Sequence, residues 1–190
     1  QLPILVYFGG NGEEVSFNLE FFAEKAAANV LLLNYRGYGL STGSPSEKKL
    51  KNDAELIYDH LLTHYPVKAD QVIPIGRSLG SGIALYLAAQ KGLNKVILVT
   101  PYDSIRSVAY DYFPNFLVRW ALADTYETES LCQRFQGQML ILTAAQDEVI
   151  HPSHAQRLCA AYATNLKKRF IMIPATGHND IHINKRYWQA

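Results

Sequence analysis

The feature that most constrains the fold of this chain is a regular alternation of short apolar runs with helical patterns. The runs are five or six residues long and most are apolar at consecutive positions, as in strands buried on both faces. Their alternation with helices predicts an α/β fold, an open, doubly wound, mostly parallel sheet of about six strands flanked by helices. The candidate strands are Ile4–Phe8, Val30–Tyr35, Gln71–Gly76, Lys95–Val99, Met139–Thr143 and Arg169–Ile173.

Helical patterns fill the gaps between these runs. In the clearest one, Leu50, Ala54 and Ile57 recur at helical spacing with charged residues elsewhere, as in an amphipathic helix. Ligands of such sheets bind at the carboxyl ends of the strands, so functional residues are expected in the loops directly after them. The candidate helices are Phe17–Ala28, Glu47–Tyr65, Leu79–Lys91 and Pro152–Ala163.

Composition excludes several classes of protein. With 48% hydrophobic and 18% charged residues, the chain is not a disordered one. A net charge of +1 gives no reason to expect nucleic acid or an anionic membrane surface as a partner. Two cysteines, Cys132 and Cys159, cannot form a disulfide framework and fit a reducing, cytoplasmic setting. The apolar runs are far shorter than the roughly 20 residues of a membrane-spanning helix.

We expect residues 1–190 to form a single domain, since this length suits one hydrophobic core. The chain begins at Gln1 rather than Met, and the first candidate strand follows at once. We therefore expect a domain truncated on its N-terminal side, and a membrane anchor upstream of Gln1 is left open.

The strongest functional signal is a five-residue motif at the end of the third candidate strand. Residues 76–80 read Gly-Arg-Ser-Leu-Gly, which fits the G-x-S-x-G nucleophile elbow between a strand and a helix. Glycines on either side of Ser78 permit the tight turn that lifts the hydroxyl out of the sheet. The pattern alone is weak, because glycine and serine are common in turns. Its position indicates that Ser78 is a nucleophile.

A serine nucleophile needs a general base, and the base needs an acid that orients it. In this architecture the expected chain order is serine, acid, histidine. Asp147 follows the fifth candidate strand and His178 follows the sixth. Both lie at the predicted edge of the sheet in the expected order, so we predict a Ser78–Asp147–His178 triad.

Alternatives exist for both partners of the serine. Glu148, beside Asp147, could be the acid, as could Asp103 after the fourth strand, although Asp103 is expected to cap the following helix. His182 and His151 compete with His178 for the role of base.

Backbone N–H groups are expected to bind the oxyanion. One comes from the residue after the nucleophile, Leu79, and another from a loop after an early strand. Gly9 and Gly10 end the first strand and allow the backbone to turn inward, which makes the N–H of Asn11 the second candidate.

No motif for a metal or an organic cofactor emerges. The loop at residues 35–45 matches neither a P-loop nor a dinucleotide fingerprint, and His60 and His64 lack the glutamate of a zincin. His178, Asp180 and His182 could together form a metal site, but the predicted triad accounts for His178 without a metal.

Six motifs are spread over nearly the whole chain. They are Gly9-Gly10-Asn11, Tyr35-Arg36-Gly37-Tyr38-Gly39-x-Ser41-x-Gly43-x-Pro45-Ser46-Glu47, Gly76-Arg77-Ser78-Leu79-Gly80-Ser81-Gly82, Pro101-Tyr102-x-Ser104-Ile105, Asp147-x-x-Ile150-x-Pro152 and Gly177-His178-Asn179-Asp180. Together they resemble the alpha/beta-hydrolase superfamily and, within it, the BEM46-like branch of serine hydrolases. The resemblance implies the Ser78–Asp147–His178 triad, the N–H donors at Asn11 and Leu79, and esterase, lipase or thioesterase activity without a cofactor. Many members carry an N-terminal membrane anchor or extra strands.

Two departures from the family pattern bear on the site. Gly9 stands where these proteins usually have histidine, and no large cap domain is inserted; residues 100–137 form the only long stretch between strands. In that stretch Tyr102, Phe113 and Phe116 are candidates for an apolar wall that binds the acyl group, although ordinary helix packing explains each of them equally well.

The expected function is therefore hydrolysis of a carboxylic ester or thioester through an acyl-enzyme. The expected substrate is a neutral small molecule or a lipid. Two alternatives stay open, a serine peptidase or amidase on the same fold and a non-catalytic member that binds a ligand or a partner.

Overall fold

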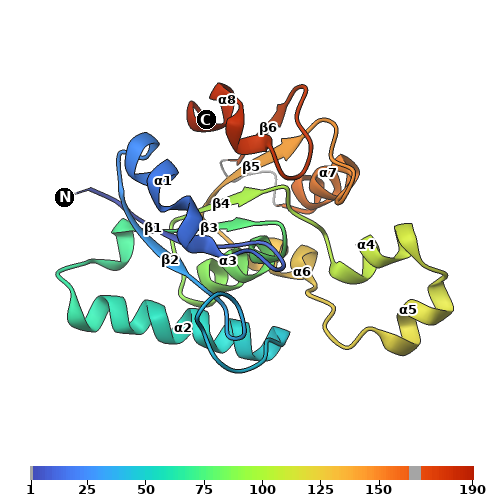
Figure 1. Cartoon of the computed structure of the whole chain (residues 1–190), viewed down its shortest axis with the longest axis horizontal. Helices are drawn as coiled ribbons and strands as arrows, with labels where there is room; N and C mark the ends of the chain where they lie inside the picture. Colours follow the sequence, from blue (N-terminus) through green and yellow to red (C-terminus); the bar gives the residue numbers. More distant parts are fainter. Residues whose placement is uncertain (1, 163–167) are drawn as a thin grey trace.

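The computed structural model describes residues 2–162 and 168–190. It is built around a six-stranded sheet of order β2-β1-β3-β4-β5-β6, in which every neighbouring pair is parallel (Figure 1). Helices cover both faces, so the predicted doubly wound α/β fold is confirmed. The strands are β1 (Ile4–Phe8), β2 (Asn29–Leu33), β3 (Val72–Arg77), β4 (Lys95–Val99), β5 (Gln138–Ala144) and β6 (Lys168–Ile173).

The strands agree with the sequence-based ranges to within one residue at most ends. The exception is β2, which was predicted to reach Tyr35 but ends at Leu33. The side chain of Asn34 accepts a hydrogen bond from the Val15 N–H and donates one to Glu14. These bonds tie Asn34 to the segment after β1, and the chain leaves the sheet there.

The helices divide between the two faces of the sheet according to the cores that they bury. One core contains side chains of α2, α3, α6 and α7, and the other contains side chains of α1 and α8. The bounds are 3₁₀ helix η1 (Val15–Asn18), α1 (Leu19–Lys25), α2 (Glu47–His64), 3₁₀ helix η2 (Ala69–Gln71), α3 (Leu79–Gln90), α4 (Ile105–Tyr112), α5 (Asn115–Ala121), α6 (Thr128–Arg134), α7 (Pro152–Ala161), 3₁₀ helix η3 (Ile181–Ile183) and α8 (Lys185–Trp188).

Three predicted helices differ from the structure at their ends, one of them only because α3 ends at Gln90 rather than Lys91. The range Phe17–Ala28 is wrong as a single helix, because η1 occupies its first turn and the backbone is already extended at Ala26. Helix α2 ends at His64, because Tyr65 precedes Pro66 and is extended, as residues before proline usually are. The predicted end of α7, Ala163, lies outside the described residues.

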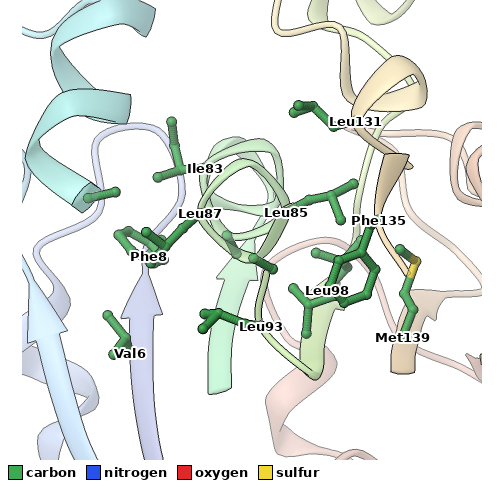
Figure 2. Close-up of a cluster of buried hydrophobic side chains, with 14 of the residues drawn as sticks. Val6, Phe8, Ile83, Leu85, Leu87, Leu93, Leu98, Leu131, Phe135 and Met139 are labelled. Atoms are coloured by element: carbon green, nitrogen blue, oxygen red, sulfur yellow. The ribbon is translucent and has the colours of Figure 1, made fainter. Parts of the chain in front are cut away.

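Helix α3 packs directly on the middle of the sheet (Figure 2). A Cβ atom on Gly80 would lie 2.1 Å from the Phe8 carbonyl oxygen, and one on Gly76 would lie 2.1 Å from the Gly80 carbonyl oxygen. Only glycine permits this approach, which sets the first turn of α3 against β1 and β3. The labelled side chains of this core are Val6, Phe8, Ile83, Leu85, Leu87, Leu93, Leu98, Leu131, Phe135 and Met139.

Between β4 and β5, the helices α4 and α5 project from one side of the molecule (Figure 1). Val118 is the only buried residue of α5. The cap of α4 differs from expectation, because the N-cap is Ser104, whose hydroxyl accepts from the Ser107 N–H. The prediction that Asp103 caps this helix is therefore wrong by one residue. Among the described residues, no helix has both the length and the apolar character needed to cross a membrane.

Candidate active site

Ser78 lies in a sharp turn between β3 and α3. Its backbone has φ of 52° and ψ of −120°, a left-handed conformation that is unfavourable for a residue with a side chain. The turn is tied to the end of the neighbouring strand β4, because the Ser78 N–H donates to the Val99 carbonyl at 2.9 Å. The strand–turn–helix context that the G-x-S-x-G pattern requires is present.

The structure brings His178 and Asp147 to this serine. His178 Nε2 is 3.0 Å from Ser78 Oγ, and His178 Nδ1 is 2.8 Å from Asp147 Oδ2. All three residues are buried, with at most 9% of their surface exposed. The arrangement is a continuous chain from hydroxyl to imidazole to carboxylate, the geometry in which an imidazole can take a proton from a serine.

Backbone contacts hold the acid and the base together. The Ala145 and Gln146 N–H groups donate to the Ile173 and Thr176 carbonyls at 3.0 and 2.8 Å, which joins the loops after β5 and β6. The Asp147 carboxylate accepts from the N–H groups of Val149 and Ile150 at 3.0 and 2.7 Å. The carboxylate is therefore fixed in position before any substrate arrives.

The competing acids and bases lie elsewhere. Glu148 is exposed beside Asp147, and Asp103 binds His154 at 2.7 Å. His151 caps α7, and His182 packs edge-on against Phe21. Among the histidines of the described residues, only His178 hydrogen-bonds to Ser78.

The candidate oxyanion donors flank the serine. The Leu79 N–H belongs to the first residue of α3, where no carbonyl of the same helix can accept it. The loop carrying Asn11 lies close to Ser78, since a Cβ atom on Gly10 would lie 3.5 Å from Ser78 Cβ. The Asn11 side chain accepts from the Tyr38 hydroxyl at 2.6 Å, which ties this loop to the segment after β2.

An ion pair that the sequence analysis missed links this loop to the histidine loop. Arg77 donates to Glu13 Oε2 at 2.8 Å, to the His178 carbonyl at 3.1 Å and to Asn179 Oδ1 at 2.7 Å. The same Glu13 oxygen accepts the Gly10 N–H at 2.6 Å. Burial raises the pKa of Glu13, but its hydrogen bonds and Arg77 outweigh burial and hold the pKa below its ordinary value. Since 64 residues separate Arg77 from Glu13, local patterns carry no signal for this pair.

A second aspartate–histidine pair was also missed. His154, which is completely buried, has Asp103 on Nδ1 and Asp111 on Nε2, each at 2.7 Å. Arg157 Nε donates to Asp103 at 2.6 Å. Burial lowers the pKa of His154, yet its hydrogen bonds to the two carboxylates outweigh burial and raise the pKa above its ordinary value. The cluster joins α7 to α4.

The predicted acyl-binding wall is not assembled as a unit. Tyr102 is fully buried, and its hydroxyl donates to the Leu79 carbonyl at 3.0 Å. Phe113 and Phe116 are 60% and 70% exposed, near and in α5. Tyr102 therefore binds the backbone of the residue directly after Ser78, whereas the two phenylalanines are exposed on the surface. Within the described residues, no cluster of three or more His, Cys, Asp or Glu side chains could hold a metal ion.

Comparisons with known proteins bear on the fold of this chain. Residues 3–126 match the family described as alpha/beta hydrolase fold. The chain is 35% identical to the uncharacterized membrane protein YNL320W of Saccharomyces cerevisiae over 90% of this chain and 61% of that protein. It is 28% identical to protein bem46 of Schizosaccharomyces pombe over 99% of this chain and 65% of that protein. The chain thus spans less than two thirds of the length of these relatives.

A solved structure has the same fold at low sequence identity. A hydrolase from Pseudomonas aeruginosa superposes with a TM-score of 0.72 and 16% identity, covering 99% of this chain and 88% of that one. At this identity the likeness shows the fold alone.

Proposed function

This chain belongs to the alpha/beta hydrolase fold family, and from that premise we propose that it is a serine hydrolase of carboxylic esters or thioesters. The observation that carries the proposal is the hydrogen-bonded chain from Ser78 through His178 to Asp147. Nothing obliges a binding module to keep a strained serine within 3.0 Å of a buried imidazole, so the geometry favours catalysis over the non-catalytic alternative.

In the first half of the proposed reaction, Ser78 Oγ attacks the carbonyl carbon of the substrate while His178 Nε2 takes the hydroxyl proton. Asp147 keeps the other imidazole proton on Nδ1 and stabilises the imidazolium that forms. The carbonyl oxygen becomes an oxyanion, which the N–H groups of Asn11 and Leu79 bind. One such donor contributes about 3 kcal/mol to stabilisation of the transition state.

The tetrahedral intermediate then expels the alcohol or thiol, which takes the proton from His178. This leaves an acyl ester on Ser78. In the second half, His178 removes a proton from water, the hydroxide adds to the acyl carbon, and collapse returns the proton to Ser78 Oγ and releases the carboxylic acid.

Esters and thioesters are proposed over amides because their leaving groups need less protonation. The cytoplasmic location belongs to the same proposal. It is supported by Cys132 and Cys159, which are both free thiols in a protein that needs no disulfide.

Labelling with a fluorophosphonate tests the assignment. The expected result is one covalent adduct on Ser78, detected by mass spectrometry, and no adduct in Ser78→Ala. Ser130→Ala is the matched control, because Ser130 is an exposed serine of α6 and its loss should leave labelling unchanged. An unlabelled wild-type protein, or equal labelling of Ser78→Ala, contradicts the proposal and favours a non-catalytic member. Matched ester, thioester and amide substrates then separate the esterase from the amidase.

A further inference from the structure

A cavity of about 420 Å³ lies between the segment after β1 and the C-terminal helix. Helices α1 and α8, which border it, lie near each other in the fold (Figure 1). Its size is within the usual range of small-molecule sites. Its wall combines polar side chains with aromatic ones, and the aromatic ones are Tyr7, Phe17, Phe21, Phe22, Tyr187 and Trp188.

The cavity adjoins the candidate active site at three points. Gly12, Arg77 and Asn179 line it. Each is the chain neighbour of a proposed functional residue, since they flank Asn11, Ser78 and His178 in turn. The Arg77 guanidinium, which binds Glu13 and the His178 carbonyl, is therefore the boundary between the cavity and Ser78, and a group that extends from a carbonyl bound at Ser78 would enter the cavity past this boundary.

The charged residues of the wall leave little attraction for an anionic ligand. Arg77 is paired with Glu13 at 2.8 Å, and Glu14 accepts from Asn34 and Ser16. Burial and the nearby Arg77 lower the pKa of His182 below its ordinary 6.5, so its imidazole is neutral at pH 7. A carboxylate or phosphate group would find no unpaired cation among these lining residues.

The rim of the cavity carries uncovered apolar surface. Phe17 and Phe21 are 80% and 44% exposed, and removing such surface from water is favourable. Behind them the wall is rigid, because Phe22 packs edge-on against both Tyr7 and Trp188, with ring centroids 5.1 and 5.8 Å apart.

We propose that this cavity binds the uncharged apolar chain or ring of the ester or thioester substrate. The inference rests on the proposed function and deepens it. It also places the apolar subsite around Phe17 and Phe21 instead of at Tyr102, Phe113 and Phe116, where the sequence analysis expected it.

Trp188 provides a direct test in the whole protein. The chain has two tryptophans, and Trp120, which is 89% exposed, can be replaced by Trp120→Phe so that only Trp188 emits. This variant is labelled with an ethyl or a decyl fluorophosphonate, and the adducts are verified by mass spectrometry. The decyl adduct is expected to shift the emission of Trp188 to shorter wavelength, and the ethyl adduct is expected to leave it unchanged.

The outcomes of this test separate the two proposals. Failure of both reagents to label Ser78 overturns the proposed function and the subsite with it. Complete labelling with identical emission from both adducts leaves the serine hydrolase intact and overturns the subsite alone.

Chain-length selectivity gives a second, independent test. Activity is measured with acyl chains of increasing length and, separately, with alkyl leaving groups of increasing length, so that the two halves of the substrate are distinguished. The double variant Phe17→Ala/Phe21→Ala should reduce the preference for long over short chains about tenfold in one of the series. Phe113→Ala/Phe116→Ala is the matched control and should not. Loss of selectivity in the control pair alone, or in neither pair, refutes the subsite.

Discussion

The described part of the chain contains two buried aspartate–histidine pairs that differ in what lies on the far side of the imidazole. Asp147 and Asp103 follow the neighbouring strands β5 and β4, and they lie 2.8 and 2.7 Å from the imidazole nitrogens of His178 and His154. His178 turns its other nitrogen to the Ser78 hydroxyl, whereas His154 turns its other nitrogen to the Asp111 carboxylate.

This difference decides what each imidazole can do. The two carboxylates around His154 favour a proton on each nitrogen, and their hydrogen bonds raise the pKa of His154 against the opposing effects of burial and of Arg157, whose guanidinium lies 2.7 Å from Nδ1. With a carboxylate on both sides, this imidazole has no substrate-facing nitrogen, and it holds α4 on α7. His178 has one carboxylate and one hydroxyl, so Nε2 is free to accept the serine proton. The group on Nε2, a hydroxyl in one case and a carboxylate in the other, therefore distinguishes the two pairs more than the aspartate does.

The largest effect is expected from a substitution in the pair next to the serine. Asp147→Asn should lower kcat for ester hydrolysis by a factor on the order of 10⁴, because the imidazole loses its orienting carboxylate. Asp103→Asn, the same change in the other pair, should retain most of the kcat of the folded protein. Steady-state kinetics on both variants measure the contrast. Equal losses would mean that the two pairs are not functionally distinct.

The second effect concerns stability. His154→Ala removes the imidazole that joins two carboxylates and should lower the free energy of unfolding by about 3 kcal/mol, as measured in urea. His60→Ala, at an exposed histidine of α2, should stay within about 0.5 kcal/mol of wild type. The folded His154→Ala protein should still label at Ser78. Unchanged stability would show that the cluster is not a structural one.

A third effect is the pH dependence of that stabilisation. Because the folded pKa of His154 lies above its ordinary 6.5, its contribution is fully present below that pH and is lost as pH rises through the folded pKa. The difference in melting temperature between wild type and His154→Gln should therefore be largest in mild acid and shrink as pH rises. A difference that grows with pH reverses the sign and disproves the charged state assigned to His154.

The smallest effect sharpens the comparison within the cluster. The side chain of Asp111 is 50% exposed, against 7% for Asp103, so solvent screens its attraction to His154. Asp111→Asn should cost less than about 1 kcal/mol, clearly less than Asp103→Asn, in the same urea titration. A loss as large as that of Asp103→Asn would place the main support of His154 on the exposed side.

Most of the sheet was predictable from the sequence because buried parallel strands are apolar at consecutive positions. β1 and β4 were predicted to the residue, and β2 was overextended because a long-range bond to Asn34 ends it. The helices between β4 and β5 were not delimited, since α5 buries only Val118 and so lacks an amphipathic pattern.

The candidate site was predictable to the extent that it lies at strand ends. Ser78, Asp147 and His178 each follow a strand, and parallel strands bring such positions to one edge. What sequence reasoning lacked were pairings across the fold. Arg77 with Glu13 and His154 with Asp103 join residues 64 and 51 positions apart, and the buried position of Tyr102 depends on packing against Gly82 that no local pattern encodes.

The parallel sheet has a consequence for the order of events during folding. Ser78 and His178 are 100 residues apart, and Arg77 and Asn179 are 102 apart. Contacts at such separation are the slow ones to form, whereas helices form from local contacts. Circular dichroism should therefore recover early in a refolding experiment, while hydrolytic activity should return only when the loop after β6 has docked against β3. The rate at which activity returns would then measure the last step of folding.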